Sequence, residues 1–193
     1  HEAGNIGDCI AKCMETALSM AKEDPNVYVP QQFENEANSA AHREQTAKEI
    51  LEQAGKPIHG FCSGIGTGGT ITGIGEALKA ANPDMEIWAI EPENAAILSG
   101  KEVGSHLQMG IGDGVIPAIL NQEIYDDIVI VTDEEAVKTA KELAAKEGLM
   151  CGISSGTNVA AALRLAKKLG PGKTVVTILA DTAERYFSTP LFD

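Results

Sequence analysis

A glycine-rich stretch between residues 64 and 70 has the composition of an anion-binding loop. Gly66-Thr67-Gly68-Gly69-Thr70 follows a short apolar run and precedes a helical pattern. Glycines let the backbone approach a ligand with several N–H groups, and the positive end of the following helix attracts negative charge. Thr67 and Thr70 add hydroxyl donors. The composition favours a phosphate site, although a tight strand-to-helix turn would also use small residues.

The same stretch matches a dinucleotide-binding fingerprint. Gly64, Gly66 and Gly69 give the pattern G-x-G-x-x-G, and Glu91 follows about 20 residues later, at the end of the next expected strand. In such proteins an acid at this distance binds the ribose. A dinucleotide-binding oxidoreductase domain is therefore an alternative that the spacing leaves open.

A second turn of small residues lies at Gly152-Ile153-Ser154-Ser155-Gly156 and opens another helical pattern. From these residues alone, Ser154 is interpreted as a simple helix cap. Both turns join a β-prone stretch to a helix start, and open α/β sheets bind their ligands at that edge. Both turns are therefore candidate parts of a binding site.

Helical and strand patterns alternate along the chain with short connections. Apolar residues at helical spacing, such as Ile10, Met14 and Ala17, predict helices, and short apolar runs bounded by turn residues predict strands. The alternation predicts an α/β fold with a mostly parallel sheet and helices on both faces. The expected helices cover 7–23, 38–51, 71–81, the stretch between Thr132 and Gly148, and a stretch from about 152 to Gly170; the expected strands cover 58–62, 86–90, 128–131 and 173–179, with a short β-prone run at 27–29.

Local signals refine these elements. Asn38 and Ser39 offer caps for the second helix, and Thr132 with Glu135 fits a capping box. The last strand, at 173–179, is a nearly continuous apolar run, which suggests burial on both of its faces.

Size and charge limit the classes of function. The chain has 193 residues, of which 44% are hydrophobic and 22% charged, as expected of one globular unit. A formal net charge of −13 would repel phosphate backbones and anionic lipids, so neither nucleic acid nor a membrane is an expected partner. No apolar run approaches the roughly 20 residues of a membrane span, and no signal-peptide pattern is present.

The four cysteines, Cys9, Cys13, Cys62 and Cys151, are too few and too scattered for a disulfide framework. A reducing compartment, with the cytoplasm as the default, is therefore expected. Cys9 and Cys13 lie four residues apart on the first expected helix, but no His or Cys stands at zinc-type spacing from them. They are interpreted as small packing residues, and no metal site is predicted.

Five stretches taken together resemble the cysteine synthase (O-acetylserine sulfhydrylase) family, in the tryptophan-synthase-β-like fold, fold type II, of pyridoxal-phosphate enzymes. They occur in the family's order and cover nearly the whole chain. The resemblance implies the larger, C-terminal domain of that architecture at 35–193, with 1–34 as a remnant of the smaller domain and the rest of the N-terminal part missing. The stretches are Pro30-Gln31-Gln32-Phe33 with 35–38, Gly66 to Gly73, Gly110-Ile111-Gly112-Asp113-Gly114, 152–156, and Glu184 to Phe192.

The resemblance implies a role for individual residues. Gly66, Thr67, Gly68, Gly69 and Thr70 would bind the phosphate of pyridoxal 5'-phosphate. The Ser154 hydroxyl would hydrogen-bond the pyridine nitrogen, and Gly112 with its neighbours would line the cofactor pocket. Gln32 would help to hold the substrate carboxylate, although without the family it would be interpreted as a polar residue at a strand end.

The chain also departs from the family's pattern. Ala183 stands where relatives often have glycine, and Asp113 and Val115 stand in a loop that often has smaller or aromatic residues. The larger departure is the lysine that forms a Schiff base with the cofactor, together with the carboxylate-binding loop after it. Neither matches any stretch of this sequence, so the catalytic residue is unknown and the chain alone is expected to be inactive.

The activity that the resemblance implies for the parent protein is β-replacement, which makes L-cysteine from O-acetylserine and sulfide. A cystathionine β-synthase-like enzyme and an O-phosphoserine-using relative are alternatives within the family. The oxidoreductase domain based on Gly64, Gly66, Gly69 and Glu91 is a second class of function, and a non-catalytic binding or scaffold fragment is a third. The family also implies a homodimer and a possible complex with serine acetyltransferase.

Overall fold

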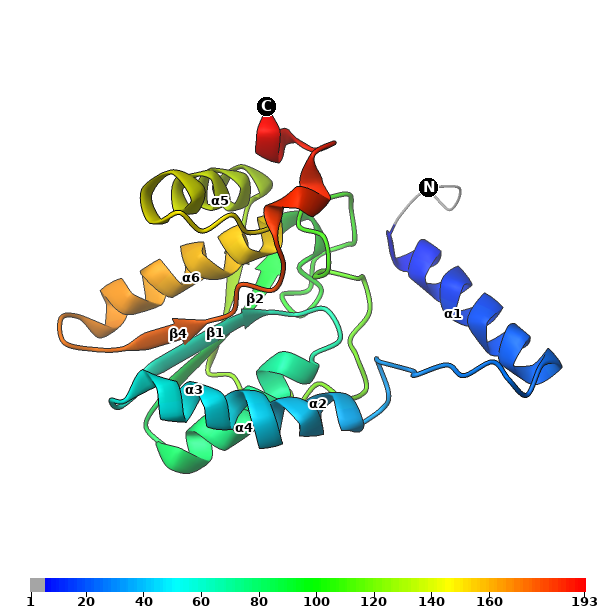
Figure 1. Ribbon diagram of the computed structural model, residues 1–193, viewed down its shortest axis with the longest axis horizontal. Coiled ribbons are helices and arrows are strands. Elements are labelled where there is room, and N and C mark those ends of the chain that lie inside the picture. The colour runs from blue at the N-terminus through cyan, green and yellow to red at the C-terminus, as the bar shows by residue number, and fades with distance from the viewer. Residues whose placement is uncertain (1–5) are drawn as a thin grey trace.

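Within residues 6–193, one parallel sheet of four strands forms the centre of the fold. The computed structural model describes residues 6–193 (Figure 1), so the first five residues of the expected 1–34 remnant lie outside it. The spatial order β3-β2-β1-β4 places the first two strands of the sequence in the middle. The strands are β1 (Gly60–Gly64), β2 (Glu86–Pro92), β3 (Asp127–Val131) and β4 (Val175–Thr177), and every pairing is parallel.

Helices cover both faces of this sheet (Figure 1). On one face, α5 (Asp133–Glu147) and α6 (Ile153–Leu169) bury residues such as Ile90 and Leu165. On the other face, Phe61 and Ile87 lie in a core with α3 and α4. The predicted α/β class is therefore confirmed. The remaining elements are α1 (Ile6–Glu23), α2 (Ala37–Ala41), the π-helical turn η1 (His42–Thr46), α3 (Ala47–Ala54), α4 (Gly69–Ala81) and the 3-10 turns η2 (Glu93–Ala95), η3 (Ala183–Tyr186) and η4 (Pro190–Phe192).

The edge position of β4 overturns one expectation. All three of its residues are only half-buried, whereas the apolar run at 173–179 predicted burial on both faces. The reason is that β4 pairs with β1 alone within residues 6–193. The run at 27–29 pairs with no strand of the described chain, and its Tyr28 side chain is 80% exposed.

The second expected helix is divided into three segments. The sequence predicted one helix over 38–51 capped by Asn38 or Ser39, but α2 begins one residue earlier and its N-cap is Glu36. Asn38 therefore lies inside the helix, where its side chain is free to bond elsewhere. The π-helical turn η1 follows, and α3 ends at Ala54, where it is capped by Gly55 with a φ of +59° in the left-handed region.

The start of α5 confirms half of the predicted capping box. The Thr132 hydroxyl oxygen accepts a hydrogen bond from the Glu135 N–H at 3.1 Å. The Glu135 carboxylate forms an ion pair with Arg164 on α6 instead of returning to the cap. The predicted end at Gly148 is confirmed, with φ at +71°.

Helix α1 lies to one side of the layered body (Figure 1). Its apolar residues Ile10, Met14 and Ala17 face a cavity and not the core of the sheet. Within residues 6–193, no helix is long and apolar enough to cross a membrane.

Helix α4 packs unusually closely against the continuous α2–η1 segment at Gly73. A Cβ atom at this position would lie 2.1 Å from the Ser39 carbonyl oxygen and 2.8 Å from the Arg43 nitrogen. Both atoms belong to the backbone, so they cannot move away as a side chain can. Arg43 and Glu76 form an ion pair across the same contact.

We expect Gly73→Ala to lower the free energy of unfolding by about 1–3 kcal/mol or more, because the added methyl must force two backbones apart. Gly75→Ala on the same helix is the matched control, since its Cβ would meet only side-chain atoms of Ile124 and Ile87. Urea unfolding followed by circular dichroism measures both values. A Gly73→Ala protein no less stable than Gly75→Ala would contradict the close contact.

Candidate functional site

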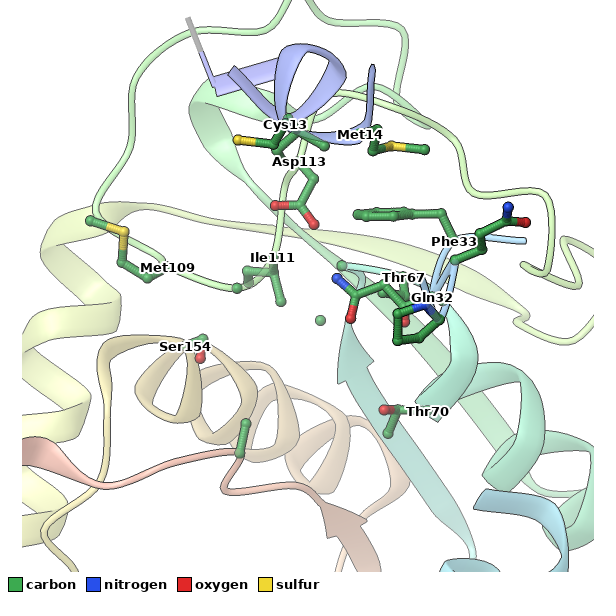
Figure 2. Close-up of a pocket in the computed structure, with 18 of the residues that line it drawn as sticks. Cys13, Met14, Gln32, Phe33, Thr67, Thr70, Met109, Ile111, Asp113 and Ser154 are labelled. Atoms are coloured by element: carbon green, nitrogen blue, oxygen red, sulfur yellow. The ribbon is translucent and has the colours of Figure 1, made fainter. Parts of the chain in front are cut away.

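A cavity of about 770 Å³ lies between α1 with the segment 29–34 on one side and the carboxyl ends of β1 and β4 on the other. The glycine loop and the 152–156 turn both reach it, because Thr67, Thr70 and Ser154 are among its lining residues. Figure 2 shows these side chains around the same space, with Gln32 beside Thr67 and Asp113 across the space from Ser154. The two turns singled out from the sequence are therefore brought together.

Close backbone contacts explain the glycines of the loop. A Cβ atom at Gly66 would lie 2.3 Å from the Gly110 carbonyl oxygen, and one at Gly69 would lie 2.2 Å from the Asn38 Oδ1 atom. Gly68 has a φ of +80° and immediately precedes the first residue of α4. These positions therefore need glycine for steric reasons, and the first turn of α4 begins two residues earlier than the sequence predicted.

Side chains from α2 and η1 hydrogen-bond both loop threonines. The Asn38 Nδ2 group donates to the Thr67 hydroxyl oxygen at 2.9 Å and also to the Gln32 carbonyl oxygen at 2.9 Å. His42 Nε2 lies 3.2 Å from the Thr70 hydroxyl oxygen, and its Nδ1 lies 3.0 Å from the Thr46 hydroxyl oxygen. Burial lowers the pKa of His42, which favours the neutral ring.

Ser154 is not a helix cap. The N-cap of α6 is Gly152, and Ser154 is the second residue of the helix. Its side chain is 4% exposed and lines the cavity, and its hydroxyl forms no hydrogen bond with any residue in 6–193. One helical turn later, the Asn158 side chain accepts from the Gly64 N–H and donates to the Ile178 carbonyl, both at 2.8 Å. Asn158 thus links the end of β1 to the residue that follows β4, and it forms part of the cavity wall.

The charged side chains around the cavity are all acidic. Glu34, Asp113 and Asp181 line it, whereas no lysine or arginine of the described chain does. Burial raises the pKa of Asp113, and nearby His106 opposes this shift. Asp181 accepts a 2.6 Å hydrogen bond from the Tyr186 hydroxyl, and its other carboxylate oxygen is buried without a partner in residues 6–193.

Gln32 lies at the cavity in a turn, not at a strand end. Its side chain is exposed, and its carbonyl is held by Asn38. The preceding residue, Gln31, has a φ of +51°, which a non-glycine residue adopts at a cost. The turn is therefore kept in an unusual conformation next to the cavity.

Gly69 and Gly112 lie directly behind the cavity wall and do not line it. The Gly112 N–H donates to the Ile65 carbonyl at 2.9 Å, and its φ is +69°. Its neighbours Ile111 and Asp113 do face the cavity. Gly112 therefore shapes the wall through its backbone.

The acid that the dinucleotide alternative requires is already bonded within the chain. Glu91 is 3% exposed. Its carboxylate oxygens accept hydrogen bonds from the Leu98 N–H at 2.7 Å, the Ser99 N–H at 3.0 Å and the Ser99 hydroxyl at 2.7 Å. The burial of this carboxylate and its three hydrogen bonds within the chain leave it poorly accessible to a ribose, which argues against that alternative.

Sequence reasoning missed Asn38 and His42, which support the site from behind, and Asn158, which lines the cavity. Asn38, His42 and Asn158 act through hydrogen bonds to loops far away in the sequence. A weak signal was available, because Asn38 and His42, like Ser154 and Asn158, are four residues apart and share a helix face. Asp113 was noted only as a departure from a family pattern. Cys13, interpreted as a packing residue, is exposed and lines the cavity.

Comparison with known proteins gives a consistent picture. Residues 3–181 match the family described as "Pyridoxal-phosphate dependent enzyme". The probable cysteine synthase of Bacillus subtilis (strain 168) is 47% identical over 182 residues, which cover 93% of this chain and 58% of that protein. The chain therefore spans less than two thirds of that relative's length.

Two solved structures share the fold closely. The O-acetylserine-dependent cystathionine β-synthase of Helicobacter pylori has a TM-score of 0.89 at 37% identity, with 93% of this chain and 58% of that chain covered. The cysteine synthase of Entamoeba histolytica has a TM-score of 0.85 at 39% identity, with 93% and 53% covered.

The thiols give a direct test of this arrangement. Burial raises the pKa of Cys62 to about 12 and also raises the pKa of Cys151, whereas Cys13 is exposed. Because the thiolate is the reactive form, we expect iodoacetamide at about pH 8 to modify Cys13 and to spare Cys62 and Cys151 until the chain unfolds. Peptide mass mapping measures this order, and early modification of Cys62 would contradict the buried core around β1.

Proposed function

Because this chain belongs to the pyridoxal-phosphate-dependent enzymes, we propose that its cavity binds pyridoxal 5'-phosphate and serves the synthesis of L-cysteine from O-acetylserine and sulfide. The cysteine synthase relatives agree with the resemblance seen in the sequence. The observation that carries the proposal is a single cavity that reaches both the glycine loop and the Ser154 hydroxyl, which has no hydrogen-bond partner in residues 6–193.

The residues present fit this cofactor. The volume of about 770 Å³ is within the usual range for small-molecule sites. The glycine loop offers backbone N–H groups at the start of α4, a helix of 13 residues, and the hydroxyls of Thr67 and Thr70. No cation lines the cavity in the described chain, so these dipoles would balance the phosphate charge. Gly69 and Gly112 would contribute through the shape of the loop and wall.

Bound pyridoxal phosphate would withdraw electrons from the α-carbon of the substrate, so that the α-proton and the β-substituent can leave. Ser154 would meet the pyridine nitrogen with a neutral hydroxyl. Such a hydroxyl does not hold a proton on that nitrogen as a carboxylate would, and this favours departure of the β-group over exchange of the amino group. The Gln32 amide would donate to the substrate carboxylate from the mouth of the cavity.

The amine that would hold the cofactor covalently has no counterpart in this cavity. No lysine of residues 6–193 lines it, and residues 1–5 contain no lysine. We therefore expect that this chain alone binds the cofactor without turning over substrate.

The choice of substrate follows from the charges around the cavity. The absence of lysine and arginine from the described lining favours the uncharged acetyl leaving group over a phosphate.

Asp113 favours a second candidate, an enzyme of the cystathionine β-synthase type. Its carboxyl group would repel anionic sulfide and attract the ammonium group of an amino-acid thiol.

Three further proposals rest on the family resemblance. Residues 1–34 would belong to the smaller domain and 35–193 to the larger, cofactor-binding domain, in keeping with the separate position of α1 (Figure 1). The working protein would be a homodimer that can associate with serine acetyltransferase. A cytoplasmic location agrees with the free thiols of Cys13, Cys62 and Cys151. Sedimentation would measure the mass of the protein alone, which tests the homodimer, and in the presence of serine acetyltransferase, which tests the complex.

Cofactor affinity tests the two ends of the proposed site. We expect Gly66→Ala to weaken binding of pyridoxal 5'-phosphate by more than about tenfold, because the methyl would displace the loop from Gly110. Ser154→Ala should weaken it by roughly fivefold through loss of one hydrogen bond. Fluorescence titration measures both, with circular dichroism to check folding and exposed Ser188→Ala as the control. Wild-type affinity in Ser154→Ala and Gly66→Ala would contradict the site.

Turnover tests the expected dependence on an outside lysine. We expect the 193-residue chain, supplied with pyridoxal phosphate, O-acetylserine and sulfide, to form no cysteine, while the Entamoeba enzyme in the same assay serves as the positive control. Replacing sulfide by an amino-acid thiol extends the assay to the second candidate. Cysteine production by the chain alone, detected by mass spectrometry, would show that a lysine of this sequence suffices.

A further inference from the structure

We propose that Asn38, His42 and Thr46 are positioning residues that make the hydroxyls of Thr67 and Thr70 hydrogen-bond donors toward a bound phosphate group. The inference rests on the cofactor site proposed above and adds the mechanism that prepares it. None of the three positioning residues lines the cavity. They would act entirely through the two threonines.

Asn38 determines the direction of the Thr67 hydroxyl. Its Nδ2 group contacts the Gln32 carbonyl, which can only accept, so the nitrogen of the amide must be on this side. The same nitrogen donates to the Thr67 oxygen at 2.9 Å, and the Gly69 N–H approaches that oxygen at 3.4 Å. A hydroxyl has two acceptor positions and one hydrogen. With both acceptor positions engaged, Thr67 keeps only its O–H for a ligand in the cavity.

His42 and Thr46 determine the direction of the Thr70 hydroxyl. A neutral imidazole carries one N–H donor and one acceptor nitrogen, so the row Thr46–His42–Thr70 has two possible polarities. If His42 carries its proton on Nε2, it donates to Thr70 and accepts from Thr46, and the Thr70 O–H is free for a ligand. If the proton is on Nδ1, Thr70 must donate to His42 and has no hydrogen left.

A phosphate group offers acceptors to these hydroxyls. It therefore binds the first polarity better and selects the Nε2–H form of His42. The Thr46 hydroxyl stabilises this form because it supplies a donor to Nδ1. The row thus extends from the cavity to a residue that no ligand touches.

The helix geometry supports this arrangement. Asn38, His42 and Thr46 follow one another at intervals of four residues, and the last two bound the π-helical turn η1. Such turns are rare and frequently mark functional sites. The backbone contact at Gly73 holds this turn against α4, whose first residues carry Thr70. The Asn38–Thr67 hydrogen bond and the Thr46–His42–Thr70 row therefore both reach the loop from the same α2–η1 helix surface.

The tautomer of His42 gives the first test. Long-range ¹H–¹⁵N spectra of histidine-labelled chain show which ring nitrogen carries the proton, and the signals lost in His42→Gln identify the residue. With inorganic phosphate or pyridoxal 5'-phosphate bound, we expect the Nε2–H form. Pyridoxal, which lacks the phosphate, should not increase that form. The Nδ1–H form in the phosphate-bound chain would overturn the proposal.

The affinity for inorganic phosphate gives the second test, because a purely structural role for Thr46 would leave it unchanged. Thr46→Val should weaken binding roughly fivefold through loss of the donor to Nδ1, while Thr46→Ser should restore wild-type affinity. Thr139→Val is the matched control, since Thr139 is a half-buried threonine in the middle of α5, on the opposite face of the sheet.

The outcomes separate this inference from the function on which it rests. If the wild-type chain bound neither phosphate nor pyridoxal phosphate, the cofactor site and the inference would both fall. If it bound both ligands and Thr46→Val bound them equally well, the inference alone would fall.

Discussion

The backbone contact between α4 and the α2–η1 segment is the constraint on which the candidate site depends. Gly69 and Gly73 lie one turn apart on α4, and a methyl group at either would collide with Asn38 or with the backbone of Ser39 and Arg43. This contact brings a helix surface to within hydrogen-bond distance of the glycine loop. Without it, the loop would still contain glycines, but its threonines would lack the partners that orient them.

The electrostatics of the site follow from the same geometry. The chain has a net charge of −13, and the charged residues that line its cavity in the described structure are acids. A phosphate group would be held here by oriented N–H groups, hydroxyls and a helix end, without a formal positive charge. Such a site depends on the direction of each dipole, because no lysine or arginine of residues 6–193 lines it to compensate for an error. The side chains that orient the two threonines, Asn38, His42 and Thr46, therefore matter more for phosphate binding here than they would in a site that contained a lysine.

The sequence predicted the long elements and the two turns well, since hydrophobic period and glycine-bounded runs are local signals. The exceptions have tertiary causes. Burial of β4 depends on how many strands flank it. The prediction of Asn38 as a helix cap was wrong because its amide group bonds to Thr67, 29 residues further along the chain. Ser154 was interpreted as a cap from local composition, and only the family resemblance suggested another role. Asn158 and His42 could not be found because their partners are set by packing, which one sequence does not display.

The position of α1 has a consequence for how a ligand and the chain support each other. The stripe of Ile10, Met14 and Ala17 completes a cavity whose other wall belongs to the sheet layer. A molecule that touches both walls joins two parts that otherwise have little common surface. By reciprocity, the free energy that α1 adds to ligand retention equals the free energy that the ligand adds to keeping α1 in place. The first helix would therefore act as part of the binding equilibrium as well as part of the wall.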